Sequence, residues 1–207
     1  MTNKLGIYYA YWTHEWEADF VPFVSRVKQL GFDVLEVNAG GVTDMARDER
    51  LRLKEEAQKH DIELTYCIGL PPEYDTASPD PAIRRNGIDF LKRQAEMMVF
   101  MEGRELGGII YGGWPASLPD GETKQAALER SADSIREVVA ELNGTDIVFN
   151  VEVVNRFEQF LLNTAEEAVT YCRRVDSPHC KLLLDTFHMN IEEDSFRTAI
   201  ATAGDRL

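Results

Sequence analysis

Six short β-rich runs alternate with six longer helical patterns along the 207 residues, and no low-complexity linker interrupts them. This alternation predicts βα units whose strands form a parallel sheet. Each run is nearly continuous in apolar residues, as expected for a strand that is buried on both faces. The predicted strands span residues 5–11, 33–38, 63–68, 108–111, 147–153 and 181–185.

Helical periodicity fills the stretches between these runs. It is clearest in residues 80–101, where apolar residues recur at three- and four-residue steps and most basic residues lie on the other side. Turn signals at Gly31 and Gly144 close two of the patterns. The predicted helices span residues 18–30, 44–60, 80–101, 124–142, 165–175 and 192–203.

The first strand distinguishes between two α/β architectures. A dinucleotide-binding sheet carries Gly-x-Gly-x-x-Gly after this strand, whereas here the strand ends in the aromatic sequence YYAYW (residues 8–12). A (β/α)8 TIM barrel is therefore favoured, although a complete barrel has eight units and about 250 residues. We expect one barrel domain over residues 1–207 that is C-terminally incomplete and covers about six βα units.

Charge and composition exclude several classes of partner. A net charge of −14 argues against nucleic acid, because affinity for phosphates comes mostly from Lys and Arg. The longest uncharged stretch, residues 106–119, is too short to cross a bilayer, and nothing at the N-terminus indicates a signal peptide. The spacing of Cys67, Cys172 and Cys180 matches no disulfide framework, which predicts reduced thiols, two of them buried, in a cytoplasmic protein.

Two carboxylates end neighbouring predicted strands, where a barrel keeps its catalytic groups. Glu152 is a charge within an otherwise apolar strand, and Asp185 ends the next strand, 33 residues later. Side by side, the two would repel each other unless a cation lay between them, which predicts a divalent metal site. The alternatives are that Glu152 caps amides of the next loop and that Asp185 caps a turn or helix ahead of Thr186.

Other polar residues near these strand ends have open roles. His188, three residues after Asp185, could bind metal, hydrogen-bond a substrate, transfer protons, or be a satisfied loop residue. Glu158 is either the partner of Arg156 or a polar group at the barrel mouth. The acidic residues 192–194 are expected to begin a helix as a solvated face.

Aromatic side chains also gather near the predicted strand ends. Their flat apolar faces suit a carbohydrate ring, and the alternative is that they plug the end of the barrel. These residues are Tyr8, Trp12, Trp16 and Trp114.

Four segments resemble the ketose 3-epimerases of the D-tagatose and D-psicose (D-allulose) 3-epimerase group. They are GIYYAYW (residues 6–12), LGFDVLEV (30–37), EVVNRFE (152–158) and LDTFHMNIEED (184–194). The resemblance implies a metal-dependent (β/α)8 barrel with Mn²⁺ or Co²⁺ that forms dimers or tetramers. It also implies epimerisation of free ketohexoses or ketopentoses at C3, such as D-fructose/D-psicose or D-tagatose/D-sorbose, through a cis-enediolate.

The same resemblance implies roles for individual residues. Glu152 becomes a catalytic residue and metal ligand, and Asp185 becomes the second metal ligand. Glu158 and His188 would hydrogen-bond the sugar near its C1 and C2 oxygens, and the apolar lining would be Tyr8, Trp16 and Trp114. The family's His ligand, substrate-binding Arg and second catalytic Glu come from its seventh and eighth strands, and we expect them beyond Leu207.

Three alternatives remain open from the sequence. The chain could be a non-catalytic fragment of such an enzyme, or an aldose–ketose isomerase that shares the barrel and the proton transfer. An endonuclease of the related metal-barrel type would need more histidine ligands and a basic groove, against which the charge of −14 argues.

Overall fold

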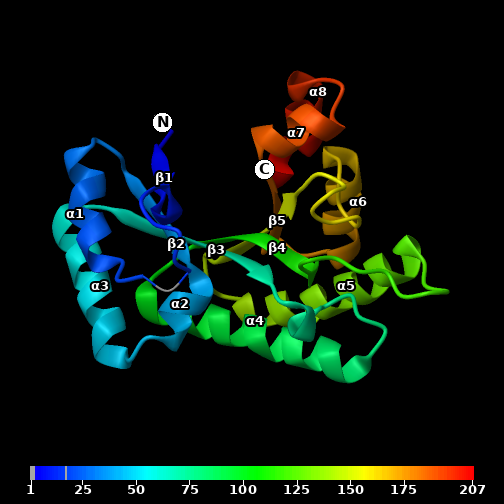
Figure 1. Cartoon of the computed structure of the whole chain (residues 1–207), viewed down its shortest axis with the longest axis horizontal. Coiled ribbons are helices and arrows are strands. Elements are labelled where there is room, and N and C mark those ends of the chain that lie inside the picture. Colours follow the sequence, from blue (N-terminus) through cyan, green and yellow to red (C-terminus); the bar gives the residue numbers. More distant parts are fainter. Residues whose placement is uncertain (1–2, 17) are drawn as a thin grey trace. The chain divides into compact units, whose positions relative to one another are not determined.

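The computed structural model describes residues 3–16 and 18–207 (Figure 1). Six strands are hydrogen-bonded in the order β1-β2-β3-β4-β5-β6, which is also their order along the chain. The pairs β1–β2, β2–β3 and β5–β6 are parallel, as the alternation of strands and helices predicts. The strands are β1 (Gly6–Tyr8), β2 (Val34–Asn38), β3 (Glu63–Leu70), β4 (Glu105–Gly113), β5 (Val148–Val153) and β6 (Cys180–Leu184).

The residues group into two compact units. The N-terminal unit comprises the chain up to Ile68 together with Arg93–Leu106, and the C-terminal unit comprises Gly69–Lys92 and Gly107–Leu207. Strands β3 and β4 and helix α4 (Pro81–Met101) contribute residues to both. The single, C-terminally incomplete barrel domain stays a prediction.

The helices of the N-terminal unit cover its strands. Helices α1 (Val21–Gln29) and α3 (Arg47–His60) pack side by side (Figure 1). Their apolar stripes are buried, because Val24 and Val27 of α1 and Leu53 of α3 have no solvent exposure. The first predicted strand is shorter than expected: β1 ends at Tyr8 and the chain continues as the 3-10 turn η1 (Tyr9–Tyr11).

The helix predicted over residues 44–60 is observed as α3 (Arg47–His60), and a separate short helix, α2 (Ala39–Asp44), precedes it. Asn38 caps the short helix α2 (Ala39–Asp44) by accepting a hydrogen bond from the Gly41 amide at 2.8 Å. The chain is extended at Ala46, and Glu49 accepts a hydrogen bond from the Ala46 amide at 2.9 Å at the start of α3.

Strand β5 has one face in the core of the C-terminal unit and one half-buried face. Phe149, Val151 and Val153 are buried, whereas the residues between them are half-buried. Burial of each of these three side chains contributes about 1.5–3 kcal/mol. Burial therefore alternates along this strand with a period of two, which places Glu152 on the half-buried face. The remaining helices of the unit are α5 (Lys124–Val139), α6 (Ala165–Val175), α7 (Thr186–Glu192) and α8 (Phe196–Ala203), with 3-10 turns η2 (Pro72–Tyr74), η3 (Ala140–Leu142) and η4 (Gly204–Arg206).

The prediction that residues 192–194 begin a helix is wrong. Glu192 is the last residue of α7, and Ser195 caps α8 with its hydroxyl oxygen, which accepts from the Thr198 amide at 3.4 Å. Glu193 accepts a hydrogen bond from the Ala165 amide at 2.7 Å, at the start of α6. Acidic side chains of this run therefore join neighbouring segments and do not form a solvated helix face.

All three cysteines are free thiols. Cys172 and Cys180 are fully buried and Cys67 is half-buried, which confirms the prediction of two buried, reduced thiols. In the described part of the chain, no helix combines the length and hydrophobicity needed to cross a membrane.

Candidate functional site

Strand β5 presents Glu152 on its half-buried face. The backbone is anchored at this residue, because the Tyr111 hydroxyl donates a hydrogen bond to the Glu152 carbonyl oxygen at 2.9 Å. Burial raises the pKa of Tyr111 well above its usual range, so the phenol remains a neutral donor. The Glu152 side chain is 22% exposed and therefore partly shielded from water.

Strand β6 places Asp185 close to Glu152. Glu152 is in register with Leu183, and Asp185 lies two residues further along the chain, on the same face. Asp185 is also the N-cap of α7, where its Oδ1 accepts a hydrogen bond from the Phe187 amide at 2.6 Å. The capping alternative is therefore correct for Asp185. A carboxylate has two oxygens, so capping through Oδ1 leaves Oδ2 for a ligand.

His188 completes this group from the first turn of α7. Its Nε2 atom lies 3.7 Å from Glu152 Oε1, and its side chain is 13% exposed. Glu152, Asp185 and His188 each offer one ligand atom, and these atoms lie within 4.8 Å of one another. Carboxylate oxygens with a neighbouring imidazole are donors that hard or borderline divalent cations accept, so the residues fit a metal ion.

Glu158 and Trp114 form a second contact in the C-terminal unit. The indole Nε1–H of Trp114 donates to Glu158 Oε2 at 3.0 Å. Arg156 instead bonds Glu192, with its Nε at 2.9 Å from Oε1 and its backbone amide at 2.8 Å from the same oxygen. The interpretation of Glu158 as the partner of Arg156 is therefore wrong. Trp114 and Glu158, which are both predicted to contact substrate, are thus hydrogen-bonded to each other.

Tyr8 and Trp16 belong to the N-terminal unit. Tyr8 is half-buried at the end of β1, and burial raises its pKa, so that it stays a neutral phenol. Its ring packs edge-on against that of Tyr9, with centroids 4.8 Å apart. Trp16 is 63% exposed, and its carbonyl oxygen accepts from the Tyr9 hydroxyl at 3.2 Å. Their contact with substrate stays a prediction.

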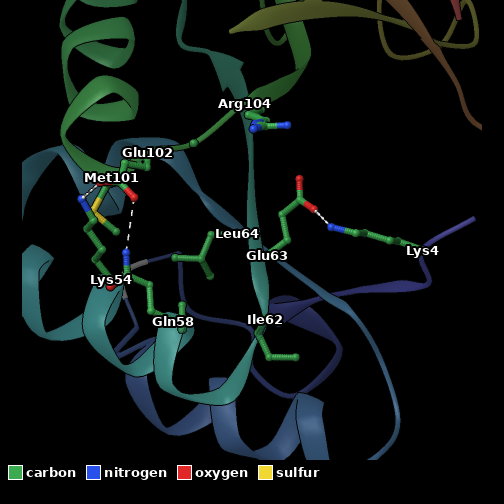
Figure 2. Close-up of a pocket in the computed structure, with 11 residues that line it drawn as sticks. Lys4, Lys54, Gln58, Ile62, Glu63, Leu64, Met101, Glu102 and Arg104 are labelled. Carbon is green, nitrogen blue, oxygen red and sulfur yellow. Dashed lines mark hydrogen bonds and ion pairs between the residues drawn. The ribbon is translucent and has the colours of Figure 1, made fainter. Parts of the chain in front are cut away.

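Each unit contains a cavity. In the N-terminal unit a cavity of about 300 Å³ lies where β3 and β4 begin, and none of the predicted site residues lines it. Figure 2 shows Lys54 directed toward Glu102, at 2.8 Å, and Lys4 toward Glu63. The strand ends that carry catalytic groups in a barrel are the opposite ones, so this cavity is not the candidate site.

The cavity of the C-terminal unit, about 340 Å³, lies beside the predicted substrate residues. Its lining includes Gly113 and Pro115, on either side of Trp114, and Gln159, which follows Glu158. Gln159 is 2% exposed, and its amide Nε2–H donates to the Gly113 carbonyl oxygen at 3.2 Å. It therefore fixes the β5–α6 connection against the end of β4.

Sequence reasoning missed two polar residues of this connection, Asn155 and Gln159. Both are 2% exposed, and Asn155 bonds His188 directly. The available signal was an amide side chain directly after a buried strand, since buried amides in such positions are normally hydrogen-bonded within the protein.

Comparison with known proteins identifies the family of the chain and several relatives. Residues 24–207 match the model of the xylose isomerase-like TIM barrel family. The chain is similar to D-psicose 3-epimerases of Ruminiclostridium cellulolyticum (44% identity over 99% of this chain and 70% of the relative) and Enterocloster bolteae (38%, 99% and 68%). It also superposes on the crystal structure of D-psicose 3-epimerase from Clostridium cellulolyticum H10 with D-tagatose, with a TM-score of 0.95, 41% identity, and coverage of 99% of this chain and 71% of that one.

Proposed function

The chain belongs to the xylose isomerase-like TIM barrel family and, within it, to the ketose 3-epimerases, and from this premise we propose that it epimerises free ketoses at C3. The observation that carries the proposal is the grouping of Glu152, Asp185 and His188 within 4.8 Å at the ends of two neighbouring strands. A carboxylate base beside a metal-binding oxygen is what removal of a C3 proton requires.

Glu152 and Asp185 would hold the divalent metal ion, with Mn²⁺ or Co²⁺ as the proposed identities. A bound divalent ion would polarise the C2 carbonyl, acidify the C3 hydrogen and stabilise the negative charge that develops on the sugar oxygens. The two side chains are suited to this because both are half-buried and come from one compact unit.

Glu152 is proposed as the base that removes the C3 proton to give a cis-enediolate. Its backbone is fixed by the Tyr111 hydroxyl, which restricts where the carboxylate can reach. Inversion requires a proton to return on the opposite face, from a second acid. The family resemblance gives that role to a carboxylate from a later strand.

The remaining predicted residues bind the sugar in this proposal. Glu158 and His188 hydrogen-bond the oxygens at C1 and C2, while Tyr8, Trp16 and Trp114 line the site with apolar surface. The Trp114–Glu158 hydrogen bond supports a shared role in sugar binding, because it holds an aromatic ring next to a carboxylate that can hydrogen-bond a hydroxyl group. We further propose a cytoplasmic homodimer or homotetramer that acts on ketohexoses or ketopentoses.

The test measures metal binding and product identity on the same protein. Mn²⁺ is titrated by calorimetry, and D-fructose or D-tagatose is then incubated with the loaded protein and analysed by chromatography. Micromolar Mn²⁺ affinity with formation of the C3 epimer supports the proposal. An aldose product would indicate an isomerase, and neither binding nor turnover would indicate a non-catalytic fragment.

Two variants make the assignment specific. Glu152→Gln keeps the size of the side chain but removes its charge and basicity, and turnover should fall by about 10²-fold or more, as for loss of a general base. Glu141→Gln, which changes an exposed carboxylate paired with Lys92, is the matched control. Near-normal turnover in Glu152→Gln would contradict the role of Glu152.

A further inference from the structure

Asn155 occupies a buried position between β5 and α7. Its backbone N–H donates to His188 Nδ1 at 3.2 Å, and its side-chain Nδ2 lies 2.8 Å from the same atom. On the other side, its Oδ1 accepts a hydrogen bond from the Phe157 amide at 2.9 Å. The residue is 2% exposed, so these contacts are shielded from water.

These contacts determine the orientation of both side chains. A backbone N–H can only donate, so the Phe157 amide requires the oxygen of the Asn155 amide on its side and directs the NH₂ group toward His188. His188 Nδ1 then faces two donors and must be the acceptor. The proton of the neutral imidazole is therefore on Nε2.

The protonated atom, Nε2, is the ring nitrogen that faces the candidate site. Nε2 is the ring atom that lies 3.7 Å from Glu152 Oε1, at the group that also contains Asp185. A nitrogen that carries a proton has no free lone pair for a metal, but it can donate a hydrogen bond to a substrate oxygen. The three clustered side chains therefore divide into two metal ligands and one donor.

We infer that Asn155 is a positioning residue that fixes the Nε2–H tautomer of His188, so that His188 acts as the donor in the sugar contact proposed for it above. The inference rests on the proposed function for the identity of the acceptor, which is an oxygen of the sugar. Its structural part, the tautomer, is measurable without turnover.

Nitrogen-15 NMR of the histidine-labelled protein tests the tautomer directly. Spectra are recorded at pH 8, where free imidazole is neutral, and His188→Gln identifies the His188 signals. We expect Nδ1 of His188 to be the unprotonated nitrogen and Nε2 the protonated one. A protonated Nδ1 in the unmodified protein would overturn the inference.

Asn155→Asp tests the cause, because it replaces the NH₂ donor by an acceptor of nearly the same size. The backbone N–H of residue 155 still faces Nδ1 in this variant, but the side chain offers only acceptors, so we expect the fraction of His188 with its proton on Nε2 to fall. Asn163→Asp is the matched control for damage to the same connection, because Asn163 Nδ2 donates to the carbonyl oxygens of Val154 and Gln159. An unchanged tautomer in Asn155→Asp, or the same change in Asn163→Asp, would contradict the role of Asn155.

Mn²⁺ affinity separates ligand from donor even if Asn155→Asp does not fold. Removal of His188 in His188→Gln should weaken Mn²⁺ binding by less than about tenfold, whereas Glu152→Gln should weaken it by about 100-fold or more. Equal losses in the two variants would make His188 a ligand and overturn the inference. Both readouts are independent of turnover, so a protein without epimerase activity would count against the proposed function alone.

Discussion

Asp185 caps helix α7 and is proposed to bind the metal ion, and substitution by Asn or Ala distinguishes the two roles. As the N-cap of α7, Asp185 accepts a hydrogen bond from the Phe187 amide at 2.6 Å through one carboxylate oxygen. The same carboxylate belongs to the group of side chains that fits a metal ion. Asn caps a helix about as well as Asp but offers only a neutral amide oxygen to a cation. Ala removes both functions.

The expected magnitudes follow from these contacts. Replacing an Asp or Asn cap by Ala costs about 1 kcal/mol, which corresponds to about 2–4 °C in Tm for a chain of this length. Loss of the negative charge at the helix N-terminus costs both variants about 0.3–1 kcal/mol. In EDTA both variants also lose the repulsion between Asp185 and Glu152, which offsets the lost helix-dipole contribution. We therefore expect the clear difference in Tm to lie between Asp185→Asn, which keeps the cap, and Asp185→Ala, which loses it.

Metal affinity should respond differently from stability. Both variants should raise the Kd for Mn²⁺ by about 100-fold or more, which corresponds to about 2.7 kcal/mol. Calorimetric titration measures this, and Asp133→Asn, at a carboxylate that is 72% exposed, is the control. Unchanged Mn²⁺ affinity in Asp185→Asn would refute the ligand role, and equal Tm values for the Asn and Ala variants would refute the cap.

Three further predictions follow from other contacts. Trp114→Phe removes the hydrogen-bond donor to Glu158. KM for the ketose should rise about fivefold, which corresponds to about 1 kcal/mol, while kcat changes little. A loss confined to kcat would contradict a binding role. Arg85 and Lys92 lower the pKa of Glu137 to about 2, so its ionised form stabilises the fold above the ordinary carboxyl range and this contribution is lost as pH falls from about 4.5 toward 2. Glu137→Gln should therefore lower Tm at pH 7 and less at pH 3.5 by calorimetry, and an equal loss at both values would contradict the ion pairs. Gly87→Ala places a Cβ 2.2 Å from the Tyr74 carbonyl oxygen, so urea unfolding should show a net loss of about 1–3 kcal/mol, whereas the exposed control Asn86→Ala should lose nothing.

Strand β5 was predictable because its pattern is local. Apolar residues alternate with polar ones from Phe149 to Val153, and tertiary packing preserves that alternation, so the face of Glu152 follows directly from the sequence. The proximity of Asp185 followed from the same reasoning, because consecutive βα units place strand ends side by side.

Helix α7 was not predictable in the same way. Seven residues are too few for periodicity to mark a helix, and α7 depends on its Asp185 cap and on Met189, which packs with Ala165 and Ala199. Partners brought from elsewhere in the chain also decide the role of Arg156, which bonds Glu192 and not the nearby Glu158. Spacing along the sequence contains no information on such long-range choices.

The proposed use of the Asp185 carboxylate as both cap and metal ligand also constrains how this position can diverge. A descendant that no longer binds metal loses the need for a negative charge but keeps the need for an acceptor at the Phe187 amide. Asn, Ser and Thr meet that need and Ala does not. Among descendants that no longer bind metal, we therefore expect substitutions at position 185 to be limited to small polar residues that cap a helix. Helix α7 would then be retained after metal binding is lost.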